Sequence, residues 1–193
     1  MQITSIIRRA AQINPKGMAT IYEDRQQTWS QMLDRVARLA GGLQHLGMKS
    51  GDRVALLSLN SDRFIEYYFA TVWGGGAMMP MNIRWAAAEC AYALNDAGAT
   101  ILIVDDSFKE VAAELKSQVQ CLKTIIYCGD GETPKGMENY ENIVACNAPA
   151  KDAGRGGDDL AGIFYTGGTT GFPKGVMLSH TNFYVGGVAN AHE

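Results

Sequence analysis

The chain has 193 residues, of which 47% are hydrophobic and 19% are charged, and its formal net charge is −3. This composition is typical of one globular domain or slightly more, and it excludes a disordered tail, a collagen-like repeat and a coiled coil. The slight acidity offers no electrostatic footprint for nucleic acid, and no run reaches the roughly 18 apolar residues of a transmembrane segment. The 22 glycines, many of them clustered, indicate sharp turns or close approach to a ligand.

The N-terminus and the cysteines both point to a cytoplasmic protein. Residues 1–15 contain two arginines and no acid, as a transit peptide would, but the apolar spacing from Ile3 to Ala10 favours an amphipathic first helix. The cysteines are irregularly spaced and form no CxxC pair; they are Cys90, Cys121, Cys128 and Cys146. We therefore expect no disulfide framework and no zinc site, which fits a reducing compartment.

Helical periodicity recurs along the next part of the chain. Thr28 and Gln31 have the spacing of a helix-capping box, and apolar residues follow at intervals of three or four until Gly47 ends the helix. A second predicted helix begins at Ser61 and carries the apolar residues Phe64, Ile65, Tyr68, Phe69 and Val72. Two further helices are predicted, over 86–97 and over 107–119.

Short apolar runs bounded by turn residues predict strands at 53–59, 77–80, 100–104, 124–128 and 160–165. Strands that alternate with helices form βαβ units, so the predicted fold class is α/β, with a mostly parallel sheet flanked by helices. This fold class does not by itself imply dinucleotide binding. The glycine motif of dinucleotide-binding folds, G-x-G-x-x-G, is incomplete here, because Pro134 stands where the third glycine would follow Gly129-Asp130-Gly131.

Residues 129–159 have a different texture. They are polar, glycine-rich and weakly periodic, and only Ile143 and Val144 indicate a short element. Such a segment is typical of a surface connection. The predicted organisation is an α/β subdomain over 1–128, a polar surface connection over 129–159, and a hairpin followed by a truncated helix over 160–193.

The loop after the last predicted strand has the composition of a phosphate cradle. It combines glycines, threonines and a lysine, namely Thr166, Gly167, Gly168, Thr169, Thr170, Gly171 and Lys174. Glycine lets backbone N–H groups turn toward an anion, threonine hydroxyls donate to phosphate oxygens, and lysine supplies a mobile charge. Pro173 excludes a Walker A loop, which needs glycine directly before lysine. By composition alone, a flexible turn between two strands is an equally good interpretation.

The stretch YTGGTTGFPKGVMLSH at 165–180 resembles the signature loop of the adenylate-forming superfamily. That superfamily comprises acyl-CoA synthetases, luciferases and the adenylation domains of nonribosomal peptide synthetases. Its pattern is Tyr/Phe-Thr-Ser/Gly-Gly-Thr-Thr-Gly-x-Pro-Lys-Gly-Val, with a histidine and an asparagine shortly downstream. The positions that match are Tyr165, Thr166, Gly168, Thr169, Thr170, Gly171, Pro173, Lys174 and Gly175. Gly167 is a variant common among fatty acyl-CoA ligases, and residues 28–52, 61–82 and 84–105 resemble the family's earlier motifs.

The resemblance implies an acid–thiol ligase of fatty acid metabolism. Carboxylate and ATP would form an acyl-adenylate and pyrophosphate, and the thiol of coenzyme A would then displace AMP to form a thioester. ATP, Mg²⁺ and coenzyme A are the implied cofactors of the full-length enzyme. The β- and γ-phosphates would be held by Thr166, Thr169, Thr170 and Lys174, with backbone N–H groups of Gly167, Gly168 and Gly171.

The family's other motifs lie outside this sequence. They are the segment that contacts adenine and supplies a magnesium-binding glutamate, the aspartate that binds ribose, and the C-terminal lysine that assists adenylation. We therefore expect an N-terminal fragment with no catalytic residue of its own, inactive alone and prone to form homodimers through uncovered apolar surface. The alternatives are a non-catalytic ATP- or pyrophosphate-binding module, a purely structural fragment, and part of a peptide-synthetase adenylation domain.

Several residues have both a functional and a structural interpretation. His180 follows the loop and is a tempting catalytic base, but a residue at a helix start that shapes the site is favoured. Tyr67, Tyr68 and Trp73 are expected in the core or an interface because of their helical spacing, rather than in an aromatic box. Asp105–Asp106 is expected to form a turn at a strand end rather than a metal pair.

Overall fold

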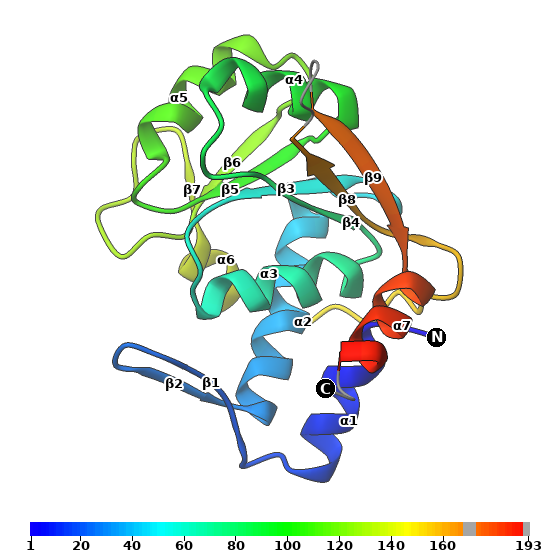
Figure 1. Cartoon of the computed structure of the whole chain (residues 1–193). Coiled ribbons are helices and arrows are strands. Elements are labelled where there is room, and N and C mark those ends of the chain that lie inside the picture. Colours follow the sequence, from blue (N-terminus) through cyan, green and yellow to red (C-terminus); the bar gives the residue numbers. More distant parts are fainter. Residues whose placement is uncertain (168–172, 191–193) are drawn as a thin grey trace.

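The computed structural model describes residues 1–167 and 173–190 (Figure 1). Its helices are α1 (Thr4–Ile13), α2 (Trp29–His45), α3 (Asp62–Trp73), α4 (Ala87–Ala97), α5 (Lys109–Gln118), α6 (Tyr140–Cys146) and α7 (His180–Asn190). Its strands are β1 (Met18–Tyr22), β2 (Arg25–Thr28), β3 (Arg53–Leu57), β4 (Ala77–Pro80), β5 (Ile101–Val104), β6 (Thr124–Tyr127), β7 (Glu138–Asn139), β8 (Leu160–Thr166) and β9 (Lys174–Ser179).

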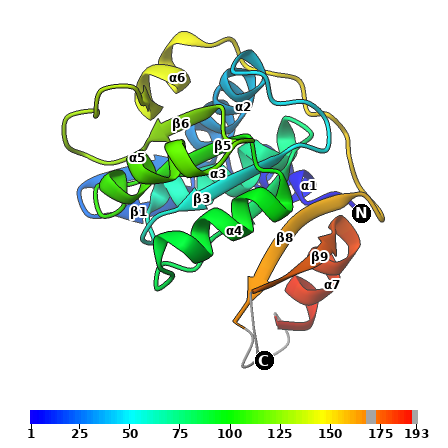
Figure 2. The same cartoon turned by 90° about the horizontal axis from the view of Figure 1, so that it is seen from above.

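A seven-stranded sheet in the order β7-β6-β5-β3-β4-β8-β9 forms the centre of the molecule. Neighbouring strands are parallel except for β8 and β9, which pair antiparallel. Helices cover both faces of this sheet (Figures 1 and 2). The predicted α/β fold with a mostly parallel sheet flanked by helices is confirmed.

The sheet separates two hydrophobic cores. Along β3, Val54 and Leu56 face the core formed with α1, α2, α3 and α6, whereas Ala55 and Leu57 face the core formed with α4 and α5. Cys90 lies fully buried in the second core, as its apolar surroundings predict. Because both faces of the sheet are covered, the strands consist of nearly unbroken apolar residues.

The capping box that begins α2 is confirmed. The Gln31 N–H donates to Thr28 Oγ1 at 3.3 Å, and the Thr28 N–H donates to Gln31 Oε1 at 2.9 Å, so two N–H groups of the first turn are satisfied. The helix ends before Gly47, whose φ of 99° is a conformation that only glycine adopts freely.

The helix α3 buries charged residues beside its apolar ones. Of the predicted apolar residues, Val72 is fully buried, Phe64, Tyr68 and Phe69 are partly buried against the same core, and Ile65 is 40% exposed. The buried face also carries Arg63, Glu66 and Tyr67. A rule that assigns charged residues to the surface fails here, because both charges have partners that neutralise them inside the protein.

Glu66 is the centre of this buried polar network. Its carboxylate is fully buried and accepts hydrogen bonds from Arg35 Nε at 2.6 Å, from Gln27 Nε2 at 2.7 Å and from the Tyr140 hydroxyl at 2.8 Å. Arg35 also pairs with Glu141 at 2.9 Å. The network therefore joins β2, α2, α3 and α6. Burial, reinforced by the neighbouring Glu66 charge, raises the pKa of Tyr140 well above its usual value.

The aromatic residues of α3 behave as the structural interpretation predicts. The fully buried Tyr67 donates from its hydroxyl to the Val54 carbonyl at 2.6 Å and accepts from the Met79 N–H at 2.7 Å. Trp73 is 7% exposed and donates from Nε1 to the Ala150 carbonyl at 2.9 Å. These side chains tie α3 to the sheet and to the segment before β8.

The structure contains elements that the sequence analysis missed or only indicated. The β1–β2 hairpin turns at Glu23, which has a φ of 52°. Within 129–159, β7 pairs with β6, and Ile143 and Val144 do lie in a short helix, α6, with both side chains buried. The division into 1–128, 129–159 and 160–193 stays a prediction.

Replacing Glu66 should strongly destabilise the fold. A Glu66→Ala variant leaves Arg35 and Tyr140 without their shared acceptor, and breaking a buried pair costs about 3 kcal/mol or more. Urea unfolding monitored by circular dichroism measures this change. Glu110→Ala, which removes an exposed glutamate of α5, is the control and should stay within about 0.5 kcal/mol of the wild type. Equal midpoints for the two variants would contradict the network's role.

Candidate functional site

Three of the seven predicted phosphate-binding residues are described, and they lie at the tip of the β8–β9 hairpin. Thr166 ends β8 and stands opposite Lys174, which begins β9. The Thr166 hydroxyl donates to the Lys174 carbonyl at 3.4 Å. The structure thus brings Thr166, Gly167 and Lys174 together, all exposed. Four predicted residues lie outside the described part of the chain: Gly168, Thr169, Thr170 and Gly171.

Lys174 presents its positive charge to solvent. Its side chain is exposed, and none of the ion pairs between described residues involves it. By contrast, the half-buried Arg35 forms an ion pair with Glu66. The ammonium at the hairpin tip is therefore available to an anion.

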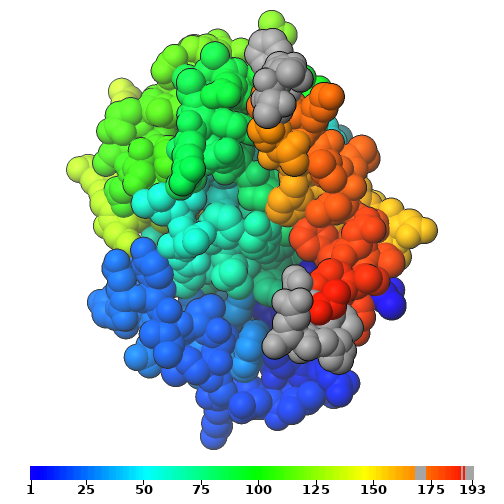
Figure 3. Space-filling view, viewed as in Figure 1, coloured from blue at the N-terminus to red at the C-terminus, as the bar shows by residue number. Residues whose placement is uncertain are grey.

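Tyr165 fastens the hairpin tip to α4. Its hydroxyl donates to Asp96 Oδ2 at 2.5 Å, and its ring meets Trp85 edge-on with centroids 6.0 Å apart. Burial and the bond to Asp96 raise the pKa of Tyr165 above its usual value. Figure 3 shows the hairpin residues in orange packed beside the green residues of α4.

Gly175 makes this packing feasible. It stands opposite Tyr165, and a Cβ atom there would lie 2.8 Å from Ile163 Cγ2 and 3.1 Å from Tyr165 Cζ. The signature glycine at this position therefore leaves room for the tyrosine ring. Sequence reasoning did not find Asp96 or Trp85, because their contact with β8 joins segments about 70 residues apart and depends on how α4 crosses the sheet.

His180 begins α7 directly after β9, which confirms its position at a helix start. Its side chain is fully buried, and Nδ1 accepts from the Ile3 N–H at 3.4 Å. The ring is thus enclosed at the base of the hairpin, at the end opposite its tip. This position is the one that the structural interpretation of His180 expects.

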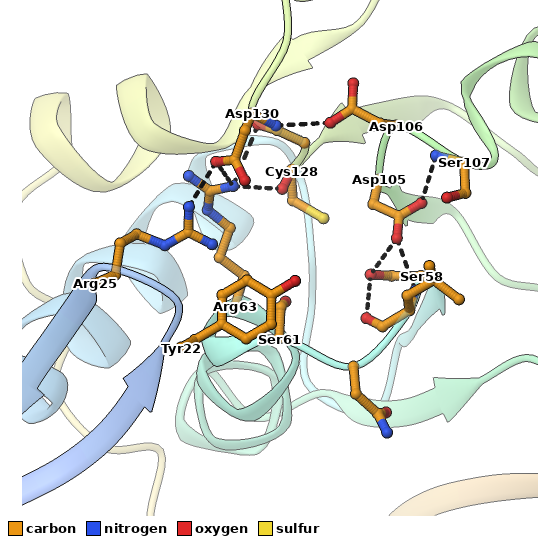
Figure 4. Close-up of a pocket in the computed structure, with 13 residues that line it drawn as sticks. Tyr22, Arg25, Ser58, Ser61, Arg63, Asp105, Asp106, Ser107, Cys128 and Asp130 are labelled. Atoms are coloured by element: carbon orange, nitrogen blue, oxygen red, sulfur yellow. Dashed lines mark hydrogen bonds and ion pairs between the residues drawn. The ribbon is translucent and has the colours of Figure 1, made fainter.

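A second candidate site lies at the carboxyl ends of the central strands (Figure 4). In the sheet order, β3 leads through α3 to β4 on one side, whereas β5 leads through α5 to β6 on the other. Such a switch point commonly binds ligands in α/β proteins. A cavity of about 160 Å³ is found there, and it is lined by residues 58–61, 105–107 and 128–130 together with Arg25 and Arg63.

The charges of this cavity are satisfied internally. Asp130 accepts hydrogen bonds from Arg25 at 2.7 Å and from Arg63 at 2.8 Å. These bonds, the one from Arg25 most of all, lower the pKa of Asp130 below its usual value. Asp105 accepts from the N–H groups of Leu59 at 2.7 Å and Ser107 at 2.9 Å. The expected turn at the end of β5 is thus confirmed.

No cluster suited to a metal ion occurs among the described residues. Because the cavity has all its charges paired while the hairpin tip has a free cation, the hairpin is the stronger candidate for binding an anionic ligand.

The comparisons with known proteins agree with this geometry. The chain matches the family model described as AMP-binding enzyme over residues 7–193. Feruloyl-CoA synthase from an Amycolatopsis species is 33% identical over 90% of this chain and 32% of its own length. Long-chain-fatty-acid–CoA ligase from Thermus thermophilus is 34% identical over 82% of this chain and 29% of its own. The chain spans about a third of the length of the curated relatives it matches.

Solved structures share the fold. The N-terminal domain of FACL13 from Mycobacterium tuberculosis superposes with a TM-score of 0.81 at 30% identity, over 93% of this chain and 44% of that one. A fatty acyl CoA synthetase from the same organism gives a TM-score of 0.80 at 29% identity, over 93% and 34%. Since the family model extends over nearly the whole sequence and carries the hairpin with it, the chain belongs to the AMP-binding enzyme family.

Proposed function

We propose that residues 1–193 form the N-terminal part of an ATP-dependent acid–CoA ligase, and that the β8–β9 hairpin holds the β- and γ-phosphates of ATP. The observation that carries the proposal is the exposed Lys174 opposite Thr166, at the start of a glycine-rich sequence, with no ion pair to any described residue. The relatives' names support the reaction class, since they are CoA ligases and synthases.

In the proposed reaction a carboxylate oxygen attacks the α-phosphorus of ATP, and pyrophosphate leaves. The thiol of coenzyme A then attacks the acyl carbon, the C–S bond forms, and AMP departs. Lys174 would neutralise charge that builds on the leaving pyrophosphate, and Thr166 would orient it through its hydroxyl.

A fatty acid is the carboxylate that we propose. Gly167 supports it as the variant common among fatty acyl-CoA ligases, and two relatives are named for medium- or long-chain fatty acids. Others are named for 4-hydroxybutyrate and ferulate, so the acid pocket differs within the family. Because the chain spans about a third of these relatives, we propose that residues 1–193 alone bind ATP without turning it over.

The setting that we propose is the cytoplasm. All four cysteines are free thiols, which fits a reducing compartment. Burial raises the pKa of Cys90 to about 11, so this thiol stays protonated. Across the described residues, no helix has the length and apolar character to span a membrane. We also propose self-association through exposed apolar side chains of β9, where Val176 is 43% and Met177 is 67% exposed.

Lys174→Ala should abolish stabilisation of the chain by ATP. At an ATP concentration of ten times Kd, binding stabilises by about 1.4 kcal/mol, or roughly 3–5 °C in Tm for a chain of this size. Thermal unfolding with and without ATP measures the shift. Lys135→Ala, a second exposed lysine, is the matched control and should keep the full shift. If the wild type shows none at saturating ATP, the proposed phosphate site is wrong.

Tyr165→Phe should loosen the hairpin without unfolding the sheet. The variant keeps the ring contact with Trp85 but loses the hydrogen bond to Asp96, which corresponds to about 1 kcal/mol. Amide hydrogen exchange should become about fivefold faster in β8 and β9, whereas β3 and β5 stay unchanged. Tyr22→Phe, in the separate β1–β2 hairpin, serves as the comparison. Uniform acceleration over all strands would indicate global destabilisation instead of local anchoring.

A further inference from the structure

The base of the phosphate-binding hairpin rests on the chain's own N-terminus. The Gly157 N–H donates to the Met1 carbonyl at 2.8 Å, and the Thr181 N–H donates to the Gly157 carbonyl at 2.9 Å. The His180 N–H donates to the Asp159 carbonyl at 3.2 Å. Figure 1 shows the blue N-terminus beside the start of α7. The segments that enter β8 and leave β9 are thus tied to residues 1–3.

The side chain of His180 completes this junction. It is fully buried, and its Nδ1 accepts from the Ile3 N–H at 3.4 Å. An imidazole nitrogen that accepts carries no proton, so the ring is neutral with its proton on Nε2. Nε2 has no hydrogen-bond partner within the part of the chain that the structure describes. The ring therefore depends on one contact through which it acts as an acceptor.

Burial of His180 outweighs the two nearby carboxylates, which by themselves favour a charged ring. Asp159 and Asp152 face it, as do Arg155 and the N-terminal amino group. Asp159 already pairs with Arg155 at 3.1 Å, and Asp152 pairs with Arg8 at 3.4 Å. Burial is the main reason why the pKa of His180 lies below its usual value, and the two cations add to the effect.

We propose that His180 is a positioning residue for the phosphate-binding hairpin, which it holds to the N-terminal segment only while its ring is neutral. Protonation would place a donor on Nδ1, facing the Ile3 N–H, and the contact would be lost. Because His180 follows β9 without an intervening residue, loss of this contact loosens the base of the hairpin that carries Lys174, while β9 stays paired with β8. ATP binding then weakens as the pH falls. The inference rests on the proposed function of the hairpin.

The pH window follows from the sign of the shift. The folded-state pKa of His180 is lower than the unfolded value of about 6.5. The unfolded chain therefore takes up the proton first, and stability is retained above about pH 6.5 and decreases as the pH falls through the folded-state pKa. ATP affinity of the folded chain should fall only at lower pH, where the buried ring itself takes up a proton.

Two substitutions at His180 test the proposal. In His180→Asn the amide oxygen replaces Nδ1 as acceptor and does not titrate, whereas His180→Leu removes the acceptor. The ATP dissociation constant should increase from pH 7.5 to pH 5.5 in both proteins. The factor of increase should be about fivefold larger in the wild type than in His180→Asn. The comparison cancels the titration of ATP's own terminal phosphate, which has a pKa of about 6. His180→Leu should bind weakly at both pH values.

Ile7→Ala separates positioning from stability. Ile7 is fully buried in α1, the helix that follows Ile3, so the variant destabilises this region without removing the His180 ring. At 10 °C it should keep the wild-type ratio of ATP dissociation constants at the two pH values. A measurement on the wild type alone needs no variant: the amide NMR shifts of β8 and β9 should titrate together with the His180 ring.

The outcomes distinguish the two proposals. If the wild type does not bind ATP at pH 7.5, the proposed function fails and the inference fails with it. If the wild type binds but has the same pH ratio as His180→Asn, or if hairpin shifts do not follow the ring, His180 is not the positioning residue and the proposed function stands. If His180→Leu does not fold, the His180→Asn ratio and the wild-type titration still decide.

Discussion

The fully buried carboxylate of Glu66 is the interaction on which the lower half of this fold depends. An ion inside a protein is tolerated only when its hydrogen-bonding capacity is filled, and Glu66 satisfies this by drawing β2, α2 and α6 onto α3. Arg63, next to it on the same buried face, continues the network to Asp130 at the end of β6. The helices beneath the sheet are therefore fixed by directional bonds as well as by apolar contact.

The β8–β9 side of the sheet is held differently. There β8 and β9 stand at one side of the sheet and pair with each other more extensively than with β4, since β4 and β8 share the single register pair Met78 and Gly162. The hairpin is therefore attached to the parallel strands by fewer backbone contacts than those strands have with one another. Local stability that varies within one sheet is common where a loop must close on a ligand.

The sequence was sufficient for the fold class and for the strands and helices of the parallel sheet from β3 to β6, because these depend on local patterns of periodicity, caps and glycine clusters. It was insufficient where contacts between distant segments decide. Apolar periodicity gives no sign that α3 also buries a charge, because Glu66 has its partners on three other elements. The contacts Tyr165–Asp96 and His180–Ile3 likewise join positions far apart in the chain, and no local signal announces them. The two-residue strand β7 is too short for a periodic pattern to show.

The place of β9 in the sheet affects how the chain must be handled in solution. It is the last strand in the order, so along its outer edge no other described strand satisfies its backbone groups. Val176 and Met177 add apolar surface to that edge. An open edge of this kind is a template for strand addition, and neither a proline nor a lysine interrupts it between Gly175 and Ser179. Concentrated samples of the isolated chain should therefore aggregate through β9. A charged substitution at Met177 should reduce this aggregation.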